Sequence, residues 1–352
     1  MNPYWSKSVH QLEPYTPGEQ PRITNLVKLN TNENPYPPSQ AVITAIKNAE
    51  GGCLQRYPDP SAANLKQVIA DYYGLVANQV FVGNGSDEVL AHIFRGLLQH
   101  CEKILFPDIS YSFYPVYCGL FSIDYEQVPL GSNFELNIED YERPNGGIIF
   151  PNPNAPTGIS LELNQIEQLL SFSPHSVVVV DEAYVDFGAE SAANLIDRHD
   201  NLVVVQTLSK SRALAGLRVG FAMANSGLID GLERVKNSFN SYPLGSLAQA
   251  GAVASIQDEN WFEDNRAKVI ESRDKLAKSL SGLGFDILPS KANFLFVTHP
   301  KYAANKLAVE LRSRAIIVRH FDLPRIDQYL RITIGTEAQC EKLISACQKI
   351  MG

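Results

Sequence analysis

Two ionisable residues each follow an apolar run that is typical of a buried strand. If the two strands are parallel, both residues lie at the same edge of the sheet and face one crevice. Valines 177–180 lead directly into Asp181, and valines 203–205 are followed a few residues later by Lys210. Ligands of open α/β sheets bind at the carboxyl ends of the strands, so both side chains are expected in the same crevice. A buried carboxylate needs a cation or a strong donor, and a lysine there can act as a nucleophile. Considered alone, the two residues favour a structural ion pair.

The stretch FVGNGSDEVL indicates an anion site between a strand and a helix. Residues 83–85 follow the strand, and Ser86 and Asp87 open the helix, so free backbone N–H groups face outward at the positive end of the helix dipole. An ordinary capped turn is the competing interpretation, because Ser is a favoured N-cap. A dinucleotide fingerprint is disfavoured, since its third glycine would fall on Glu88, and no Gly-Lys-Ser/Thr of a P-loop follows.

A second set of groups could hold the same anion. Arg218 lies eight residues beyond Lys210, and the hydroxyls of Thr207 and Ser209 precede the lysine. Phosphate, lysine and acid would then meet in one crevice. Pyridoxal phosphate needs all three, because it carries a phosphate, an aldehyde for a lysine and a ring nitrogen that must stay protonated against a carboxylate.

The elements that must position these residues alternate along the first two thirds of the chain. Strand-like runs (QVFVGNG, KILFPD, IDYEQVPL, GGIIFPNP, VVVVDEAY, NLVVVQTLSK) are separated by amphipathic stretches such as SDEVLAHIFRGLLQH and LNQIEQLLSF. This order predicts an α/β fold with a mostly parallel central sheet flanked by helices.

The pattern changes after about residue 242. Two helices are expected in PLGSLAQAGAVASIQ and WFEDNRAKVIESRDKLAKSLSGLGF, followed by strands NFLFVTH, AIIVRHF and YLRITIG with two further helices. We predict a large domain over residues 31–256. Residues 1–30 and 257–352 are predicted to form a smaller α+β domain, with the first thirty residues wrapping onto it and adding little to a sheet.

Composition excludes several classes of partner. The formal net charge is −8 without a basic block, so neither nucleic acid nor an anionic membrane surface is an expected partner. Neither a secretory signal nor a long apolar run is apparent, and five scattered cysteines without a C-x-x-C pair suit a reducing compartment, so a cytoplasmic protein is expected. No metal-ligand spacing is present among the seven histidines, and no metal is expected.

The order of eight short motifs resembles the fold-type I aminotransferases, and among them the histidinol-phosphate aminotransferase family. These motifs are KLNTNENPY, RYPDP, GNGSDE, YSFY, NPNAPTG, DEAY, TLSKSRALAGLRVG and LRITIG. The resemblance covers nearly the whole chain. It implies pyridoxal 5′-phosphate as the cofactor and a transaminase activity.

The resemblance also assigns roles to individual residues. Lys210 would be the Schiff-base lysine, Asp181 the partner of the ring nitrogen, and Tyr184 a donor to the phenolic oxygen of the cofactor, although Tyr184 could instead only end a strand. Tyr111 would stack on the ring, with simple packing as the alternative. The phosphate contacts would come from Gly85, Ser86, Asp87, Thr207, Ser209 and Arg218.

Two further implications concern the partner subunit and one departure from the family pattern. Tyr57 of RYPDP would reach the phosphate in the partner's site, which implies a homodimer. Where many relatives have an asparagine before Pro-Thr-Gly, this chain has Ala155. Asn154 is therefore expected to contact the phenolic oxygen, with Asn152 or water as alternatives.

The implied substrates are histidinol phosphate and 2-oxoglutarate, with glutamate as a product. Arg331 in LRITIG resembles the arginine that binds the substrate anion, and Arg319 is a second candidate, although an isolated arginine in a strand is more often a surface cation. Tyr15, Asn34 and Tyr242 are further candidate substrate contacts. An aromatic amino-acid aminotransferase, a threonine-phosphate decarboxylase and a non-catalytic ligand sensor of the same fold are the alternatives. Known sensors carry an added DNA-binding region, and no basic helix-turn-helix segment is apparent here.

Overall fold

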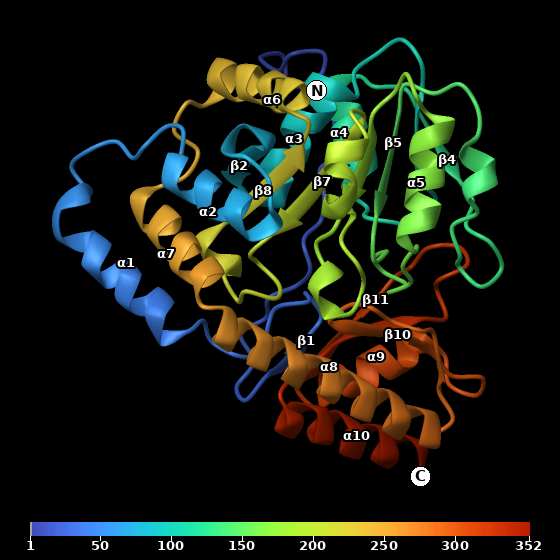
Figure 1. Cartoon of the computed structure of the whole chain (residues 1–352). Helices are drawn as coiled ribbons and strands as arrows, with labels where there is room; N and C mark the ends of the chain where they lie inside the picture. The colour runs from blue at the N-terminus through green and yellow to red at the C-terminus, as the bar shows by residue number, and fades with distance from the viewer. Residues whose placement is uncertain (1) are drawn as a thin grey trace.

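Two β-sheets organise the chain in the computed structural model (Figure 1), which describes residues 2–352 and, at residues 52 and 53, the backbone alone. The larger sheet has the order β2-β8-β7-β6-β5-β3-β4. Its strands, in chain order, are β2 (Val80–Asn84), β3 (Ile104–Pro107), β4 (Tyr125–Val128), β5 (Gly147–Pro151), β6 (Val178–Asp181), β7 (Leu202–Thr207) and β8 (Val219–Ala224). Strand β8 is antiparallel to both neighbours, and the other paired strands are parallel.

Alternation along the buried strands builds two apolar layers. Val178 and Val180 of β6 face a cluster completed by α1 (Gln40–Cys53), α2 (Ala63–Tyr73), α5 (Leu163–Phe172) and α7 (Ser246–Gln257). Val179 faces the opposite cluster, with α3 (Gly85–Leu97), α4 (Tyr114–Phe121) and α6 (Ser226–Phe239). Because both faces are covered, a continuous valine run is stable as a strand.

The smaller sheet has the order β1-β11-β12-β10-β9. Its strands are β1 (Val27–Leu29), β9 (Asp286–Ile287), β10 (Phe294–Thr298), β11 (Ile316–His320) and β12 (Leu330–Thr333). Helices α8 (Glu259–Gly282), α9 (Ala304–Ser313) and α10 (Glu337–Met351) complete its apolar core, and Figure 1 shows the long α8 and α10 lying along this part of the molecule. Short 3₁₀ segments connect the elements: η1 (Val9–Gln11), η2 (Ala77–Gln79), η3 (Ile138–Tyr141), η4 (Val185–Phe187), η5 (Ala192–Arg198) and η6 (Ala215–Leu217).

The predicted fold class is confirmed, and the predicted strands match the two sheets. Three strands were not predicted: β1, β8 and the two-residue β9. Strand β8 follows directly from the loop that carries Arg218, and its glycine and alanine residues give a weak strand pattern. Strand β1 corrects the expectation that the first thirty residues add little to a sheet, because its three residues pair in parallel with β11. The domain boundaries at 30/31 and 256/257 stay a prediction.

Candidate active site

A cavity of about 590 Å³ lies at the carboxyl ends of β6 and β7 and is also lined by residues of β11 and β12. It brings together most of the predicted site residues, namely Tyr15, Ser86, Asp87, Tyr111, Asp181, Tyr184, Thr207, Ser209, Lys210, Arg218, Arg319 and Arg331. The carboxyl ends of parallel strands meet at one edge of a sheet, which explains why residues so distant in sequence share this cavity.

Asp181, the last residue of β6, presents one free carboxylate oxygen. The side chain is 5% exposed; Oδ2 accepts a hydrogen bond from the Tyr114 hydroxyl at 3.0 Å, whereas Oδ1 is buried without a partner among the described residues. Burial raises the pKa of Asp181 to about 6, against the opposing effect of the Tyr114 hydrogen bond. An unpartnered buried acceptor beside a cavity fits a ligand with a cationic N–H group.

Tyr184 lies just after β6, and a residue that the sequence did not single out holds its hydroxyl. Asn32 Nδ2 donates to the Tyr184 hydroxyl oxygen at 2.9 Å. The Thr333 hydroxyl donates to Asn32 Oδ1 at 2.9 Å, which fixes the orientation of the amide. With its oxygen accepting from Asn32, the Tyr184 hydroxyl can donate its own proton into the cavity, as a contact to a phenolic oxygen requires.

Lys210 lies in the turn between β7 and η6, and its amine enters the cavity without a carboxylate partner within the described residues. Nζ donates to the carbonyl of Thr31 at 3.4 Å and lies 5.7 Å from the centre of the Tyr184 ring. The lysine and Asp181 share the cavity but form no salt bridge within 4.0 Å in the described structure. The ion-pair interpretation of these two residues is therefore not supported.

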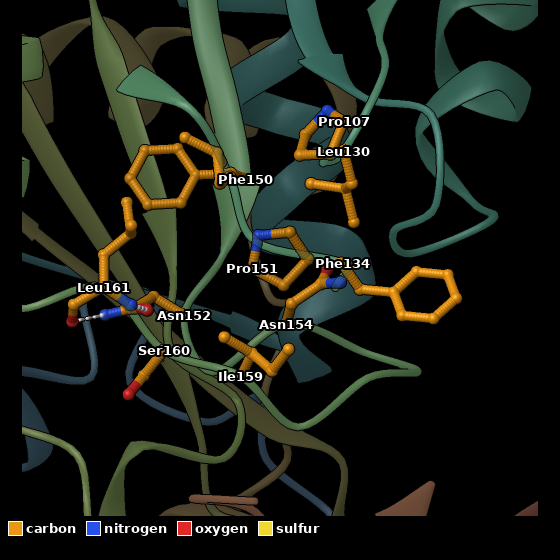
Figure 2. A pocket seen from close by; sticks show the side chains of 11 residues that line it. Pro107, Leu130, Phe134, Phe150, Pro151, Asn152, Asn154, Ile159, Ser160 and Leu161 are labelled. Atoms are coloured by element: carbon orange, nitrogen blue, oxygen red, sulfur yellow. Dashed lines mark hydrogen bonds between the residues drawn. The ribbon is translucent and has the colours of Figure 1, made fainter. Parts of the chain in front are cut away.

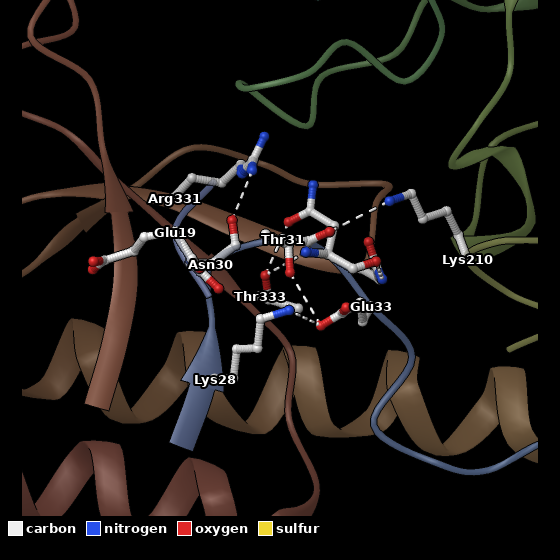
Figure 3. A network of polar contacts seen from close by, with 10 residues as sticks. Glu19, Lys28, Asn30, Thr31, Glu33, Lys210, Arg331 and Thr333 are labelled. Carbon is white, nitrogen blue, oxygen red and sulfur yellow. Dashed lines mark hydrogen bonds and ion pairs between the residues drawn. The ribbon is translucent and has the colours of Figure 1, made fainter. Parts of the chain in front are cut away.

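Residues 30–34 thread between the two sheets and contact the site at several points (Figure 3). Figure 3 shows Arg331 and Lys210 approaching this segment from opposite sides: Arg331 Nη2 donates to the Asn30 carbonyl at 3.0 Å, and Lys210 Nζ reaches Thr31. Asn34, a predicted substrate contact, does not line the cavity. Its amide instead donates to the carbonyls of Lys210 at 3.0 Å and Ser211 at 3.1 Å, so it supports the turn that carries the lysine.

The first turn of α3 and Arg218 form the expected anion cradle. Arg218 Nη2 contacts Asp87 Oδ2 at 2.7 Å, and the Tyr111 hydroxyl donates to Asp87 Oδ1 at 3.0 Å. The carboxylate of Asp87 thus orients the arginine, a role that sequence reasoning missed because it assigned Asp87 only a backbone amide. The hydroxyls of Thr207 and Ser209 lie 2.9 Å apart on the same side of the cavity.

Two glycines allow this cradle to form. Gly85 has a φ of +79°, and a Cβ there would collide with the guanidinium of Arg218. At Gly220 on β8 a Cβ would lie 2.8 Å from the Cα of Ser86. Only glycine lets β8 pass so close to the start of α3. Backbone N–H groups, a guanidinium and two hydroxyls around this space fit a phosphate group.

Arg319 and Arg331 lie directly opposite each other on β11 and β12. Both line the cavity, and neither forms an ion pair with a carboxylate in the described part of the chain. Burial lowers the pKa of Arg331, and its Nε is buried without an acceptor. Two adjacent half-buried arginines without a carboxylate partner favour an anionic ligand.

Asn154, expected to contact the phenolic oxygen of the cofactor, is not among the residues that line this cavity. Its amide nitrogen donates to the carbonyl of Ile109 and the hydroxyl of Thr157, both at 3.0 Å. Figure 2 shows Asn154 beside a separate small cavity of about 20 Å³, where Asn152 bonds the backbone of Leu161. The Asn152 amide is satisfied by the loop itself, whereas Asn154 Oδ1 is buried without a partner among the described residues, so the predicted cofactor contact of Asn154 stays a prediction.

Tyr57 and Tyr242 also lie outside the cavity. They are 82% and 42% exposed, and their rings stack with centroids 4.7 Å apart. Contact between Tyr242 and a substrate in the same subunit is therefore not supported. The predicted role of Tyr57 concerns a partner subunit and stays a prediction.

Comparison with known proteins agrees with this geometry. The family model described as aminotransferase class I and II matches residues 24–347. The chain is 62% identical to histidinol-phosphate aminotransferase 1 of Methylococcus capsulatus over 351 residues (100% of this chain, 98% of the relative). It is 59% identical to histidinol-phosphate aminotransferase of Pseudomonas syringae pv. syringae over 344 residues (98% of each chain).

Solved structures share the fold. The histidinol-phosphate aminotransferase of Clostridium acetobutylicum aligns with a TM-score of 0.86 at 22% identity, over 93% of this chain and 99% of that chain. The Sinorhizobium meliloti enzyme, solved in complex with pyridoxal-5′-phosphate, aligns with a TM-score of 0.82 at 23% identity, over 92% of this chain and 90% of that chain. The extent of the family match and the identity to full-length relatives establish that this chain belongs to the class I and II aminotransferases.

Proposed function

We propose that this protein transfers the amino group of histidinol phosphate to 2-oxoglutarate, forming imidazole-acetol phosphate and glutamate, with pyridoxal 5′-phosphate as cofactor. The identity of about 60% over the full length to proteins that carry this name supports the reaction. The observation that carries it in this structure is the pair of adjacent arginines in the cavity, Arg319 and Arg331, which have no carboxylate partner among the described residues.

The arginine pair distinguishes a phosphate substrate from a monocarboxylate. Histidinol phosphate has no carboxylate beside its amine, so its phosphate must supply the anion. A dianion can accept from both guanidiniums and offset the repulsion between them, whereas one carboxylate offsets only half of the charge. Glutamate and 2-oxoglutarate also carry two negative charges. One arginine pair can therefore serve both half-reactions.

The residues of the cavity fit the cofactor. Asp181 Oδ1 would accept the ring N–H, Tyr184 would donate to the phenolic oxygen, and the cradle of α3, Thr207, Ser209 and Arg218 would hold the phosphate. When bound, pyridoxal phosphate supplies an aldehyde that joins the amine and a ring that accepts an electron pair. Asn32, which also lines the cavity, would hold Tyr184 in place for its contact with the phenolic oxygen.

The protein residues divide the proton transfers and the binding between them. Lys210 Nζ acts as the base that removes the proton from the amine-bearing carbon of the substrate, and as the acid that returns it. Asp181 holds the ring proton in place throughout. Tyr111 and Tyr15, whose ring centroids lie 6.5 Å apart, line the cavity and provide apolar surface beside the reacting carbon.

An aromatic amino-acid aminotransferase is the second candidate function. The aromatic side chains of Tyr15, Tyr111 and Phe321 line the cavity and could contact a phenyl ring as well as an imidazole. The choice between the two functions therefore depends on the anion, for which the arginine pair favours the phosphate.

Comparison of amino donors tests the proposal directly. We expect the specificity constant for histidinol phosphate to exceed those for phenylalanine and tyrosine in single half-reactions followed by the colour of the cofactor. A higher specificity constant for either aromatic amino acid would overturn the assignment, because the phosphate would then not be the anion the site selects.

The same assay predicts the effect of Arg331→Ala. Loss of a charged hydrogen bond of about 1.5–3 kcal/mol should lower the specificity constant roughly ten- to hundredfold for both histidinol phosphate and glutamate. Arg314→Ala, which removes only an exposed arginine paired with Glu310, serves as the control. Unchanged kinetics of Arg331→Ala would show that another cation holds the substrate.

We also propose a homodimer acting in the cytoplasm on small-molecule substrates. Exposed apolar side chains near Tyr57 support an interface: Tyr57 stacks on Tyr242, and Leu54 and Phe239 are 72% and 80% exposed. Tyr242 could then accompany Tyr57 toward the partner's site. The described helices are not long and apolar enough to cross a membrane. Sedimentation of the purified protein should give the mass of two chains, and the mass of one chain would contradict the proposal.

A further inference from the structure

The carboxylate of Asp181 is held from behind by a side chain that does not line the cavity. Tyr114, the first residue of α4, is fully buried, and its hydroxyl donates to Asp181 Oδ2 at 3.0 Å. The other oxygen, Oδ1, has no partner among the described residues, although Asp181 lines the cavity. The two oxygens of one carboxylate thus have different environments, and Tyr114 creates the difference.

We propose that Tyr114 is a positioning residue for Asp181: it fixes the rotation of the carboxylate so that Oδ1 stays free to accept from the cofactor, and it favours the ionised carboxylate. This inference rests on the proposed function, since the ring N–H of pyridoxal phosphate is the donor that Oδ1 would meet. The residue acts through Asp181 and has no contact with the cavity itself.

The surroundings of Tyr114 fix the position of its ring. The ring packs against Phe94, Phe106 and Tyr111, with centroids 6.0, 5.8 and 5.7 Å away, and it meets Tyr111 edge-on at 88°. A ring packed on several sides holds its hydroxyl oxygen in one place, here 3.0 Å from Asp181 Oδ2. The packing of α4 against the sheet therefore brings the donor to the acid, and the hydrogen bond itself orients the O–H group.

The hydroxyl matters because Asp181 is deeply buried. Burial raises the pKa of the acid to about 6, and the bond from Tyr114 is the first effect that opposes this rise. The backbone N–H of Ala183 also lowers the pKa, and the other titratable groups that face Asp181 are Lys210 and Asp87, together with the phenols of Tyr111 and Tyr117. Without the Tyr114 hydroxyl the acid should retain its proton to a higher pH and compete with the ring nitrogen for it.

A stability cycle on cofactor-free protein tests the coupling. Tyr114→Phe is made in the wild type and in Asp181→Asn, and melting temperatures are measured on both sides of pH 6. A hydrogen bond to a charged group is stronger than one to a neutral group. The loss caused by Tyr114→Phe should therefore grow as pH rises through about 6 in the wild type and stay constant in the Asp181→Asn background.

Tyr141→Phe is the matched control for this cycle. Tyr141 is 1% exposed, and its hydroxyl has no hydrogen-bond partner among the described residues. Its substitution removes a buried phenol hydroxyl without a bond to an acid, and the effect should not vary across the same pH range. An equal effect of Tyr114→Phe at every pH, or in both backgrounds, would overturn the proposal.

A second measurement uses the holoenzyme. Nitrogen NMR on isotope-labelled pyridoxal phosphate reports the protonation of the ring nitrogen, and in Tyr114→Phe its signal should move toward that of the unprotonated ring. The turnover number should fall roughly ten- to hundredfold with little change in KM. A ring signal identical to wild type would overturn the positioning role. If the comparison of amino donors contradicted histidinol phosphate as the substrate, the stability cycle on cofactor-free protein would not change. The proposed function and the proposed role of Tyr114 can therefore fail separately.

Discussion

Replacing Lys210 with alanine should lower the rate of transamination by several orders of magnitude. The amine of Lys210 is the basic group that enters the cavity from the turn after β7, and no other lysine lines this cavity in the described structure. Without it, the substrate carbon has neither the base that removes its proton nor the acid that returns it. Single-turnover half-reactions with histidinol phosphate, read through the colour of the cofactor, measure this loss.

Covalent attachment provides a test that does not depend on turnover. The purified protein should be yellow, and borohydride should fix the cofactor to the peptide that contains Lys210. Lys275→Ala, a change of an exposed lysine on α8, should leave both the labelling and the rate unaltered. Recovery of the label on a peptide around another lysine would overturn the mechanism.

The residues that could be predicted are those for which strand ends and local turns decide position. Asp181 follows a valine run directly, and Ser86 opens a helix directly after a strand. Each was therefore placed correctly at the edge of the sheet, by the rule that parallel strands share a carboxyl edge. The eight-motif resemblance supplied the roles, which position alone does not define.

The contacts that sequence missed depend on how the two sheets pack together. Asn32 reaches Tyr184 only because β12 places Thr333 beside it, more than 300 residues along the chain. No local periodicity encodes such a contact. Tyr114, in turn, has the appearance of any core aromatic until the position of Asp181 is known.

Asn154 shows what a short motif leaves undefined. Its neighbourhood resembles the family motif, but the motif does not say to which side each amide of the loop turns. In this loop the Asn152 amide bonds the backbone of Leu161, Asn154 Nδ2 donates to the Ile109 carbonyl, and Ala155 is the residue of the three that lines the cavity. Position within a motif therefore predicted proximity to the site, but not contact with it.

Changing Asp181 to alanine should leave the cofactor bound and lower the turnover number by several orders of magnitude. The phosphate cradle around Arg218 lies on other elements and does not need the acid, so cofactor content should change little. The ring nitrogen would lose the negative charge that keeps it protonated, and an unprotonated ring is a poor electron sink. Cofactor content by absorbance and turnover by half-reaction kinetics separate the two effects.

The pH dependence of stability shows whether Asp181 is a buried acid with a raised pKa. Its pKa is raised from 3.8 to about 6 in the cofactor-free protein, so the folded state keeps the proton after the unfolded chain has lost it. Folding should therefore become less favourable as pH rises from about 4 to about 6 and then level off. Asp181→Asn cannot ionise, so its melting temperature should rise relative to wild type across this interval. The contribution of buried Glu182 cancels, because both proteins contain it.

Near-normal turnover of Asp181→Ala, together with a difference in melting temperature between Asp181→Asn and wild type that does not change with pH, would show that Asp181 is only a structural acid.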